Sequence, residues 1–309
     1  MRHVALIDIG SNTIRLVTYE LEGGHATRLF SKKRMTGLAD YVDADMRLSA
    51  EGVREACEAI AYLRRLCEKL GVDAIHPFAT ASLRNVANSK ECIEEIERRT
   101  DLRIDLVSEK DEALLGYAAF LHDAPFSDGG LVDIGGGSTE LVSFVHGTPK
   151  MALSLPMGSL KLFKRHVAGT LPFPDEAAAI RADVQGELRR ALPAGLSPAA
   201  HMCGIGGSAR AVLKLVRRMH GMPEDAREFS AEQLDELVKT LLAGGETGKG
   251  MRRARKLVLR SCPDRVHTIV PGALVLQAVV GRFGAERVYV SKFGIREGYL
   301  HERVLPHGV

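Results

Sequence analysis

The chain has 309 residues, of which 45% are hydrophobic and 26% charged, as is ordinary for a globular protein with room for roughly two domains. Its 42 basic and 39 acidic residues leave a net charge of only +3, which argues against general nucleic-acid binding. Aromatic residues make up 5% of the chain and Trp is absent, so platforms for stacking nucleic-acid bases are scarce.

The first part of the chain alternates predicted strands with predicted helices. Ser49 is a candidate helix N-cap, apolar residues then recur at helical spacing, and Gly71 ends the pattern. Strands are predicted over residues 4–7, 14–20, 26–31, 74–80 and 103–107, and helices over residues 49–71, from residue 89 onward, and over 109–121.

A turn-rich segment at residues 125–130 precedes a second series of strands and helices, and we place the main domain boundary there. Ser230 and Gln233 form a capping box. Strands are predicted over residues 131–134, 140–146, 151–155 and 287–290, with another before Gly204, and helices over 159–167, 175–192, 208–220, 230–242, 249–259 and 264–280 and from about Arg296. Strands that alternate with helices, twice over, predict an α/β protein of two lobes.

Two stretches of the chain are variants of one another. Asp8 begins the sequence DIGSNTIRLV, and Asp133 begins DIGGGSTELV. Each follows an apolar run, turns at glycine and hydroxyl residues and re-enters an apolar strand. Glycine lets a backbone approach an anion, consecutive amides form a concave anion site, and an aspartate at the strand end suits a divalent cation. Tight hairpin turns without a ligand are the structural alternative.

A third glycine segment, CGIGGSARAV, starts at Cys203, follows a short strand and opens a helix. The helix N-terminus around Gly206, Gly207 and Ser208 is a candidate anion site. A close turn from strand to helix explains the same glycines without a ligand.

Two charged residues outside the glycine segments are further candidates. Glu112 lies in the first turns of a predicted helix, where acidic side chains also serve to stabilise the helix dipole. Arg84 follows a strand into a predicted loop, and its planar guanidinium suits phosphate oxygens. Ser82 and Ser138 have no evident His and Asp partners, so we do not predict a serine nucleophile.

The five cysteines are odd in number and include no C-x-x-C pair, which predicts a reduced, cytoplasmic protein without a zinc site. Cys57 and Cys67 fall on the apolar face of a predicted helix and are expected in its core. We predict no secretory leader and no membrane span, since the chain enters a strand directly and no apolar run approaches ~18 residues.

Six ordered segments together resemble the exopolyphosphatase/guanosine pentaphosphate phosphatase (Ppx/GppA) family, in its short, two-domain form. They span nearly the whole chain: residues 8–16, 79–85, 111–117, 132–141, 204–210 and 290–298. The resemblance implies the actin–hexokinase superfamily fold, two ribonuclease-H-like lobes with the active site in the cleft between them, over residues 1–123 with 297–309 and over 124–296. Two departures are an Asp at Asp111, where the family usually has Glu, and Ser208, where Thr is common.

The resemblance also implies roles for the candidate residues. Glu112 looks like the general base that activates water, with Arg84 on the phosphoryl oxygens and Glu140 also catalytic. A Mg²⁺ ion, or another divalent cation, is expected on Asp133 and Glu140, with Asp8 as a further candidate. The remaining expected contacts hold phosphate: Ser11, Asn12, Thr13, Gly135, Gly136, Gly137, Ser138, Gly206, Gly207 and Ser208.

The implied function is an exopolyphosphatase that releases orthophosphate from inorganic polyphosphate. Residues 32–34, Lys161, Lys164 and Arg165 are candidates for a basic track that holds the chain. The basic run at 251–256 is better explained as a solvated helix face. The nearest alternative is conversion of guanosine pentaphosphate to the tetraphosphate, which needs the same residues. An actin-fold kinase and a non-catalytic sensor of alarmone or polyphosphate are further alternatives, and a homodimer without nucleic-acid or membrane partners is expected.

Overall fold

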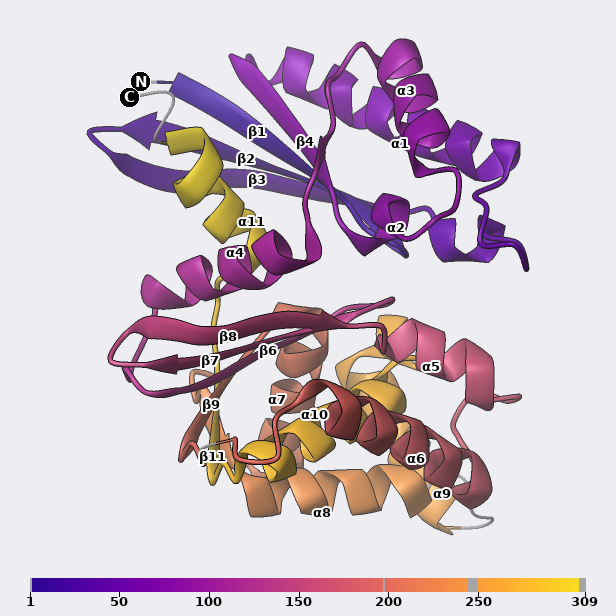
Figure 1. Cartoon of the computed structure of the whole chain (residues 1–309), viewed down its shortest axis with the longest axis vertical. Helices are drawn as coiled ribbons and strands as arrows, with labels where there is room; N and C mark the ends of the chain where they lie inside the picture. Colours follow the sequence, from indigo (N-terminus) through magenta and orange to yellow (C-terminus); the bar gives the residue numbers. More distant parts are fainter. Residues whose placement is uncertain (1, 197, 244–248, 306–309) are drawn as a thin grey trace. The chain divides into compact units, whose positions relative to one another are not determined.

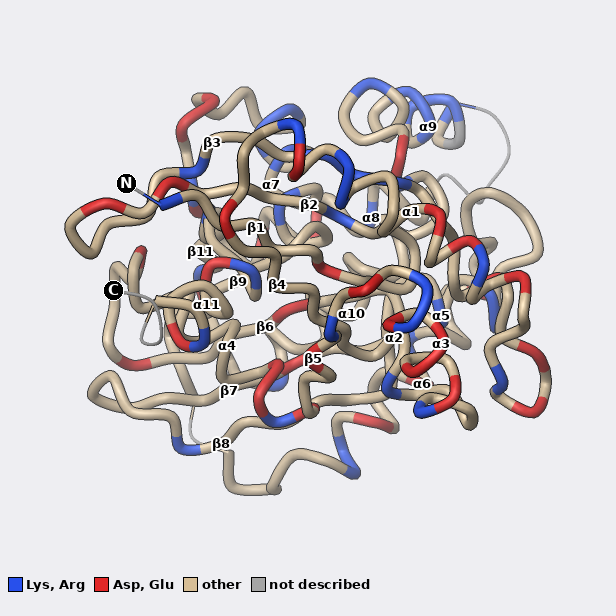
Figure 2. The backbone as a smooth tube through the Cα atoms, turned by 90° about the horizontal axis from the view of Figure 1, so that it is seen from above, with Lys and Arg blue, Asp and Glu red and all other residues tan. Residues whose placement is uncertain are grey.

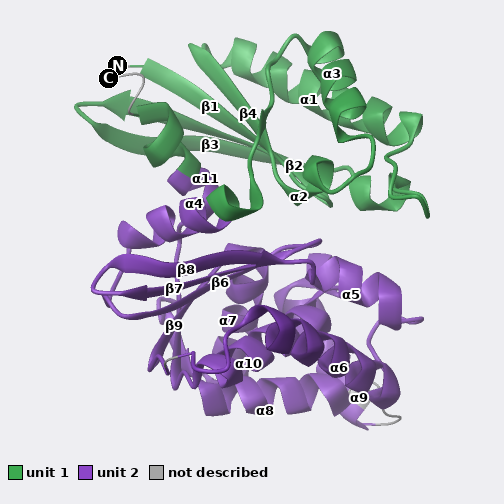
Figure 3. Cartoon of the chain, viewed as in Figure 1, with its two compact units in different colours: residues 1–112, 299–309 green, residues 113–298 purple. Residues whose placement is uncertain are grey.

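The computed structural model describes residues 2–196, 198–243 and 249–305. The chain forms two compact units (Figure 3): residues 1–112 with 299–309, and residues 113–298. The predicted limits placed residues 113–123 with the first lobe. They join the second unit because Ala113, Tyr117 and Phe120 pack against its sheet.

The first unit is built on a five-stranded sheet of order β3-β2-β1-β4-β5. β1, β2 and β3 are antiparallel neighbours, and β4 and β5 continue the sheet in parallel. The strands are β1 (Arg2–Ile9), β2 (Thr13–Glu22), β3 (His25–Met35), β4 (Ala74–Ala79) and β5 (Asp105–Leu106).

Helices cover one face of this sheet, where α1 (Ala50–Lys69) and α3 (Ser89–Thr100) close a core with Ile7, Ile9 and Leu16 (Figure 1). The predicted N-cap is confirmed, since the Gly52 amide donates to Ser49 Oγ at 3.2 Å. Gly71, with φ of +64°, follows the end of the helix. The short elements are a 3₁₀ turn (Leu38–Tyr41) and α2 (Ala81–Arg84).

From Tyr299 onward the chain belongs to this unit, whereas residues 297–298, predicted for the first lobe, fall in the second unit. α11 (Ile295–Tyr299) continues into one π-turn (Leu300–Val304). Tyr299 stacks on Phe78 of β4, with 4.4 Å between ring centroids, and its hydroxyl donates to Asp105 at 2.9 Å. Arg303 donates to Asp105 and to Asp111.

The second unit is built on a six-stranded sheet of order β10-β11-β9-β6-β7-β8. Its antiparallel β6, β7 and β8, with β9 and β11 parallel beyond β6, repeat the order and directions of the first sheet. The strands are β6 (Gly129–Ile134), β7 (Thr139–Val145), β8 (Thr148–Leu155), β9 (His201–Ile205), β10 (Glu228–Ser230) and β11 (Arg287–Val290).

One face of the second sheet carries α4 (Glu109–Leu121), and the other carries the remaining helices around the almost wholly buried α10 (Ile269–Phe283). The capping box at Ser230 and Gln233 is confirmed. The other helices are α5 (Ser159–His166), α6 (Pro174–Ala191), α7 (Gly206–His220), α8 (Ala231–Leu242) and α9 (Lys249–Ser261).

Four local predictions were wrong. The loop predicted after β4 is the one-turn helix α2, the strand predicted at 103–107 shrinks to two residues, and β10 was missed. The helix predicted at 264–280 begins at Ile269, after a 3₁₀ turn (Pro263–Arg265). These elements are short, so their hydrophobic pattern is brief and tertiary packing decides their form. No helix in the described ranges is both long and apolar enough to cross a bilayer.

Candidate active site

The first glycine turn joins β1 to β2. The Gly10 amide donates to Thr13 O at 3.1 Å, which closes the turn. The carbonyls of Ser11 and Asn12 accept hydrogen bonds from the amides of residues 36, 37 and 39. Since C=O and N–H point to opposite sides of a trans peptide, the amides of Asn12 and Thr13 are directed away from that anchor.

The second glycine turn repeats this construction between β6 and β7. The Gly135 amide donates to Ser138 O at 2.9 Å. The first turn of α5 takes up the turn's carbonyls: Ser159 binds Gly135 O, and the amides of Leu160 and Lys161 bind Gly136 O. The amides of Gly136 and Gly137 are thereby directed away from α5, where an anion can meet them.

Gly158 makes this contact with α5 possible, and sequence reasoning missed it. A Cβ built on Gly158 would lie 2.2 Å from the carbonyl oxygen of Gly136 and 2.4 Å from the nitrogen of Gly137. Only glycine lets the backbone come so close. The sequence signal was a glycine immediately before a predicted helix.

Two carboxylates of the second unit lie side by side. Asp133 and Glu140 are cross-strand partners in the β6–β7 register, so their side chains share one face of the sheet. The next strand adds Ser154, whose hydroxyl donates to the buried Glu140 at 2.8 Å. On the other side of β6, Gly206 directly follows the parallel strand β9. A Cβ on Gly206 would lie 2.1 Å from Asp133 Oδ1, so this glycine makes room for the carboxylate.

The Asp133–Glu140 pair fits a magnesium ion. Mg²⁺ is commonly held by one or two carboxylates together with water and substrate phosphate, so two adjacent acids beside a glycine turn are an appropriate donor set. Among the described residues, no group of three or more His, Cys, Asp and Glu side chains forms a metal cage. In the first unit, the position that matches Glu140 is Arg15, opposite Asp8, and an arginine there makes Asp8 a poorer metal ligand.

Glu112 and Arg84 form a largely enclosed ion pair within the first unit. Arg84 Nη1 lies 2.8 Å from Glu112 Oε2 and also donates to Val107 O at 2.8 Å. The two side chains are 13% and 12% exposed. Arg84 Nε and Nη2 are buried and make no hydrogen bond within the described residues. One edge of the guanidinium therefore fixes the carboxylate, and the other keeps donors for an anion.

The similarity between the two units extends beyond their glycine turns to the serines that hold those turns. The buried Ser82 donates to the carbonyl of Ile9, which immediately precedes the first glycine turn. Ser208 donates to the matching carbonyl of Ile134 at 2.8 Å. Each serine is followed two residues later by an arginine, Arg84 or Arg210. This Ser-x-Arg repeat was visible in the sequence and would have drawn attention to Arg210.

Arginines gather around Gly206 and Gly207. A Cβ on Gly207 would collide with the guanidinium of Arg265. Burial, with a further contribution from Arg296, lowers the pKa of Arg210 to about 10, whereas nearby Asp133 opposes this shift. Arg210 stays protonated at neutral pH, so the start of α7 presents positive charge beside the Asp133–Glu140 pair.

Some candidate groups are already engaged in structural hydrogen bonds. The Gly135 amide closes its turn and the Ser208 hydroxyl binds Ile134 O. Ser138 is buried. Of the basic track, residues 32–34 are exposed on β3, whereas Arg165 is paired with Asp183. Lys161 lies in the first turn of α5, and burial lowers its pKa.

The amino-acid sequence matches the model of the Ppx/GppA phosphatase family over residues 17–307. Exopolyphosphatase 1 of Mycobacterium tuberculosis (strain ATCC 25618 / H37Rv) is 26% identical over 305 residues, which cover 96% of this chain and 87% of the relative. The guanosine-5'-triphosphate,3'-diphosphate pyrophosphatase of Aeromonas hydrophila is 27% identical over 306 residues, which cover 96% of this chain but 58% of the relative.

Solved structures show the same fold. A Ppx/GppA family member from Aquifex aeolicus superposes with a TM-score of 0.79 at 23% identity, covering 100% of this chain and 99% of the other. An exopolyphosphatase from Cytophaga hutchinsonii gives 0.82 at 18% identity, covering 97% of each chain. The predicted α/β fold of two actin-like domains is thus confirmed.

Proposed function

Because the chain belongs to the Ppx/GppA phosphatase family, we propose that this hydrolase of phosphoanhydride bonds removes the terminal phosphoryl group of inorganic polyphosphate. The observation that carries the proposal is the Arg84–Glu112 pair, in which a positioned carboxylate shares a guanidinium that still has two buried donors. Exopolyphosphatase relatives that align over almost the whole chain support polyphosphate as the substrate.

In the proposed mechanism, Glu112 accepts a proton from the attacking water while Arg84 holds Glu112 in place. Arg84 Nε and Nη2 donate to oxygens of the transferred phosphoryl group, where negative charge must be neutralised. In the first unit, the amides of Asn12 and Thr13 supply further donors to these oxygens. In the second unit, the amides of Gly136 and Gly137 are candidate donors to phosphate. Phosphoryl transfer needs little covalent assistance, so positioning and charge neutralisation supply most of the barrier reduction.

We propose that Asp133 and Glu140 hold a divalent cation, with Mg²⁺ as the best fit to two carboxylates. When bound, the cation would neutralise charge on the phosphate oxygens. Ser154 holds the Glu140 carboxylate in position, and Gly206 leaves space beside Asp133. The cysteines are all free and buried, which supports a reducing, cytoplasmic setting, and we propose a homodimer by analogy with the family.

The experiment that tests the general base is Glu112→Gln. We expect kcat for phosphate release to fall by about 10²-fold or more, the usual scale for loss of a general base. Glu109→Gln is the matched control, because Glu109 lies on the same helix, is exposed, and is 4.0 Å from Arg84 Nε. Near-normal turnover by a folded Glu112→Gln variant would refute the assignment.

Guanosine pentaphosphate is the second candidate substrate, since a pyrophosphatase relative aligns with 96% of this chain. Hydrolysis of its terminal phosphate would use the same groups. Phosphate release measured side by side with short polyphosphate, long polyphosphate and guanosine pentaphosphate discriminates the two. A kcat/KM at least tenfold higher for polyphosphate is the result expected for an exopolyphosphatase, and the reverse order would assign the alternative.

A further inference from the structure

A basic stripe runs along α7, starting beside the Asp133–Glu140 pair. Arg210, Lys214, Arg217 and Arg218 follow one another at four-, three- and one-residue intervals. Residues spaced by four and seven lie on one face of a helix, so these side chains point to the same side. Lys214, Arg217 and Arg218 were not predicted from the sequence to bind a ligand, and Arg210 was included only in the kinase alternative.

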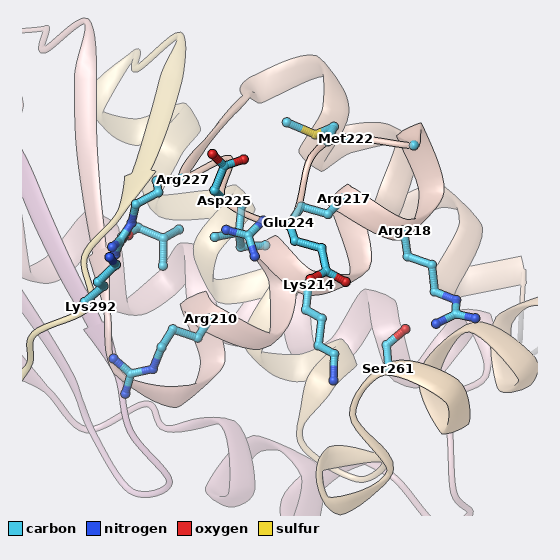
Figure 4. A pocket seen from close by; sticks show the side chains of 13 residues that line it. Arg210, Lys214, Arg217, Arg218, Met222, Glu224, Asp225, Arg227, Ser261 and Lys292 are labelled. Atoms are coloured by element: carbon cyan, nitrogen blue, oxygen red, sulfur yellow. Dashed lines mark hydrogen bonds between the residues drawn. The ribbon is translucent and has the colours of Figure 1, made fainter. Parts of the chain in front are cut away.

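The stripe forms one wall of a pocket of about 810 Å³ that lies wholly within the second unit (Figure 4). Arg227 and Lys292 add two more basic side chains, whereas Glu224 and Asp225 are the acidic ones, so positive charge predominates. The volume falls in the range of small-molecule sites, and the aromatic residue types that stack on nucleic-acid bases are absent from the lining.

Two of the basic side chains build the pocket wall. Arg217 donates to the carbonyl of Ala226 and thereby fixes the loop that follows α7. Arg227 donates to Val290 O at 3.0 Å and lies 3.6 Å from Asp123. These contacts tie the loop to β11, so the pocket is formed before any ligand arrives.

The other four cations are available to a ligand. Arg210, Lys214, Arg218 and Lys292 form no ion pair with any residue that the structure describes. Cations that converge in one pocket repel one another, and a multivalent anion would relieve this repulsion.

A buried hydroxyl provides an independent sign of a missing partner. Ser261, at the end of α9, lines the pocket, is only 2% exposed, and its Oγ has no hydrogen-bond partner among the described residues. Figure 4 shows it between the ends of Lys214 and Arg218. A buried hydroxyl without a partner is costly, and an anion oxygen would satisfy it. The same helix α9 carries a dense run of basic residues (Figure 2), which would attract a polyanion.

We propose that this pocket binds a run of phosphate groups at a site additional to the glycine turns. Phosphate matches the Arg and Lys donors, the hydroxyl and the charge, and a non-aromatic lining favours phosphate over a base. The phosphates come either from a distal stretch of a polyphosphate chain or from the diphosphate arms of a guanosine nucleotide. The inference rests on the proposed function for these two sources.

The test is a calorimetric titration in the Glu112→Gln background, where the ligand is not consumed. Adding Lys214→Gln and Arg218→Gln should weaken binding of long-chain polyphosphate about tenfold, the effect of losing two charge-assisted contacts partly exposed to solvent. The slope of log Kd against log salt concentration should fall by about one to two, by counterion release.

Lys150→Gln with Arg189→Gln is the charge-matched control, since both residues are exposed in the same unit and line no part of this pocket. This control should leave Kd within about twofold, and Ser261→Ala should weaken binding by about threefold. Equal affinities for the pocket and control double variants would overturn the proposal.

Three ligands identify the source of the phosphates. If a distal chain segment occupies the pocket, the double variant loses affinity for long polyphosphate but keeps it for tripolyphosphate. If a nucleotide occupies it, the loss appears with guanosine pentaphosphate. Unchanged affinity for all three ligands overturns the site. Failure of the proposed function is seen separately, as absent phosphate release by the unmodified chain.

Discussion

Arg84 combines two tasks that lysine cannot combine. Its Nη1 holds Glu112 and the carbonyl of Val107, while Nε and Nη2 remain as buried donors. An ammonium group carries its three donors on one nitrogen, so it cannot present two separate planar edges, one to a carboxylate and one to an anion. The sequence indicated an arginine suited to phosphate but not its contact with Glu112, because residues 28 positions apart meet only through the fold.

We therefore expect Arg84→Lys to lower kcat for phosphate release by about 10²-fold, the scale for losing a preorganised donor to developing charge. The measurement is steady-state hydrolysis of polyphosphate, with folding checked by thermal unfolding. Arg103→Lys is the control, because Arg103 is almost fully exposed. Activity within a factor of about three of the unmodified chain would show that charge alone suffices at position 84.

We expect His76 to make the stability of the first unit depend on pH. Burial, followed by the positive charge of Arg2, lowers the pKa of His76 below its ordinary value of 6.5, and Nε2 is buried without a hydrogen bond to a described residue. The unfolded chain therefore binds a proton more readily than the folded one. Stability that is present at neutral pH is lost as the pH falls below about 6.5, until the folded form also becomes protonated.

Denaturant unfolding at about pH 7.5 and about pH 5.5 tests this linkage, with the free energy of unfolding as the measured quantity. It should fall on acidification, and His76→Gln should reduce that fall because the titrating group is gone. His25→Gln, at an exposed position, should leave the pH dependence as it was. An identical fall in all three proteins would contradict the role of His76.

At the scale of elements, the second glycine turn depends on the helix that follows β8. Like every helix N-terminus, the start of α5 has amides without a partner inside the helix. These amides donate to the carbonyls of the second glycine turn. This arrangement orients the amides of Gly136 and Gly137 and requires the backbone of Gly158 to touch theirs. The second glycine turn and α5 are therefore one structural piece.

Gly158→Ala should destabilise the protein by about 1–3 kcal/mol, the usual cost of forcing a methyl group into a packed site. It should also lower phosphate release, because the turn must shift. Gly169→Ala is a matched control, since a Cβ there meets nothing within 4 Å. Thermal unfolding and KM for polyphosphate are the measurements, and equal effects at the two positions would argue against the coupling.

The long periodic elements could be predicted from the sequence, whereas their short connections could not. α1 carries apolar residues at helical spacing between Ser49 and Gly71, so pattern and capping agree. α2 has four residues, too few to show a period, and it places Ser82 where its hydroxyl donates to the carbonyl of Ile9. The Asp133–Glu140 pair was predictable, since seven residues across a tight turn fix the register. Gly158 and the Arg84–Glu112 pair required the three-dimensional structure.

The two units have kept one plan but diverged in charge. In each, a serine after a parallel strand holds the carbonyl before the glycine turn, and an arginine follows it. The position across the hairpin from the aspartate differs: Arg15 faces Asp8, but Glu140 faces Asp133. We infer that the second turn is specialised for a cation, while the first, with Arg84 and Glu112, is specialised for the anion and the attacking water.

The end of the chain completes the first unit, although more than 180 residues of the second unit separate them. Tyr299 covers the face of the first sheet opposite α1, stacks on Phe78, and donates to Asp105.

Tyr299→Ala should destabilise this unit by about 3–5 kcal/mol, as for other buried aromatics, since Phe78 loses its cover. Tyr299→Phe keeps the stack and should cost only about 1 kcal/mol for the lost hydrogen bond. Hydrogen exchange is the measurement: protection should fall in β4 and β1, while β6 and β9 keep theirs. Equal loss in both sheets would mean that the two units unfold together. Tyr299 would then stabilise the whole chain rather than the first unit alone.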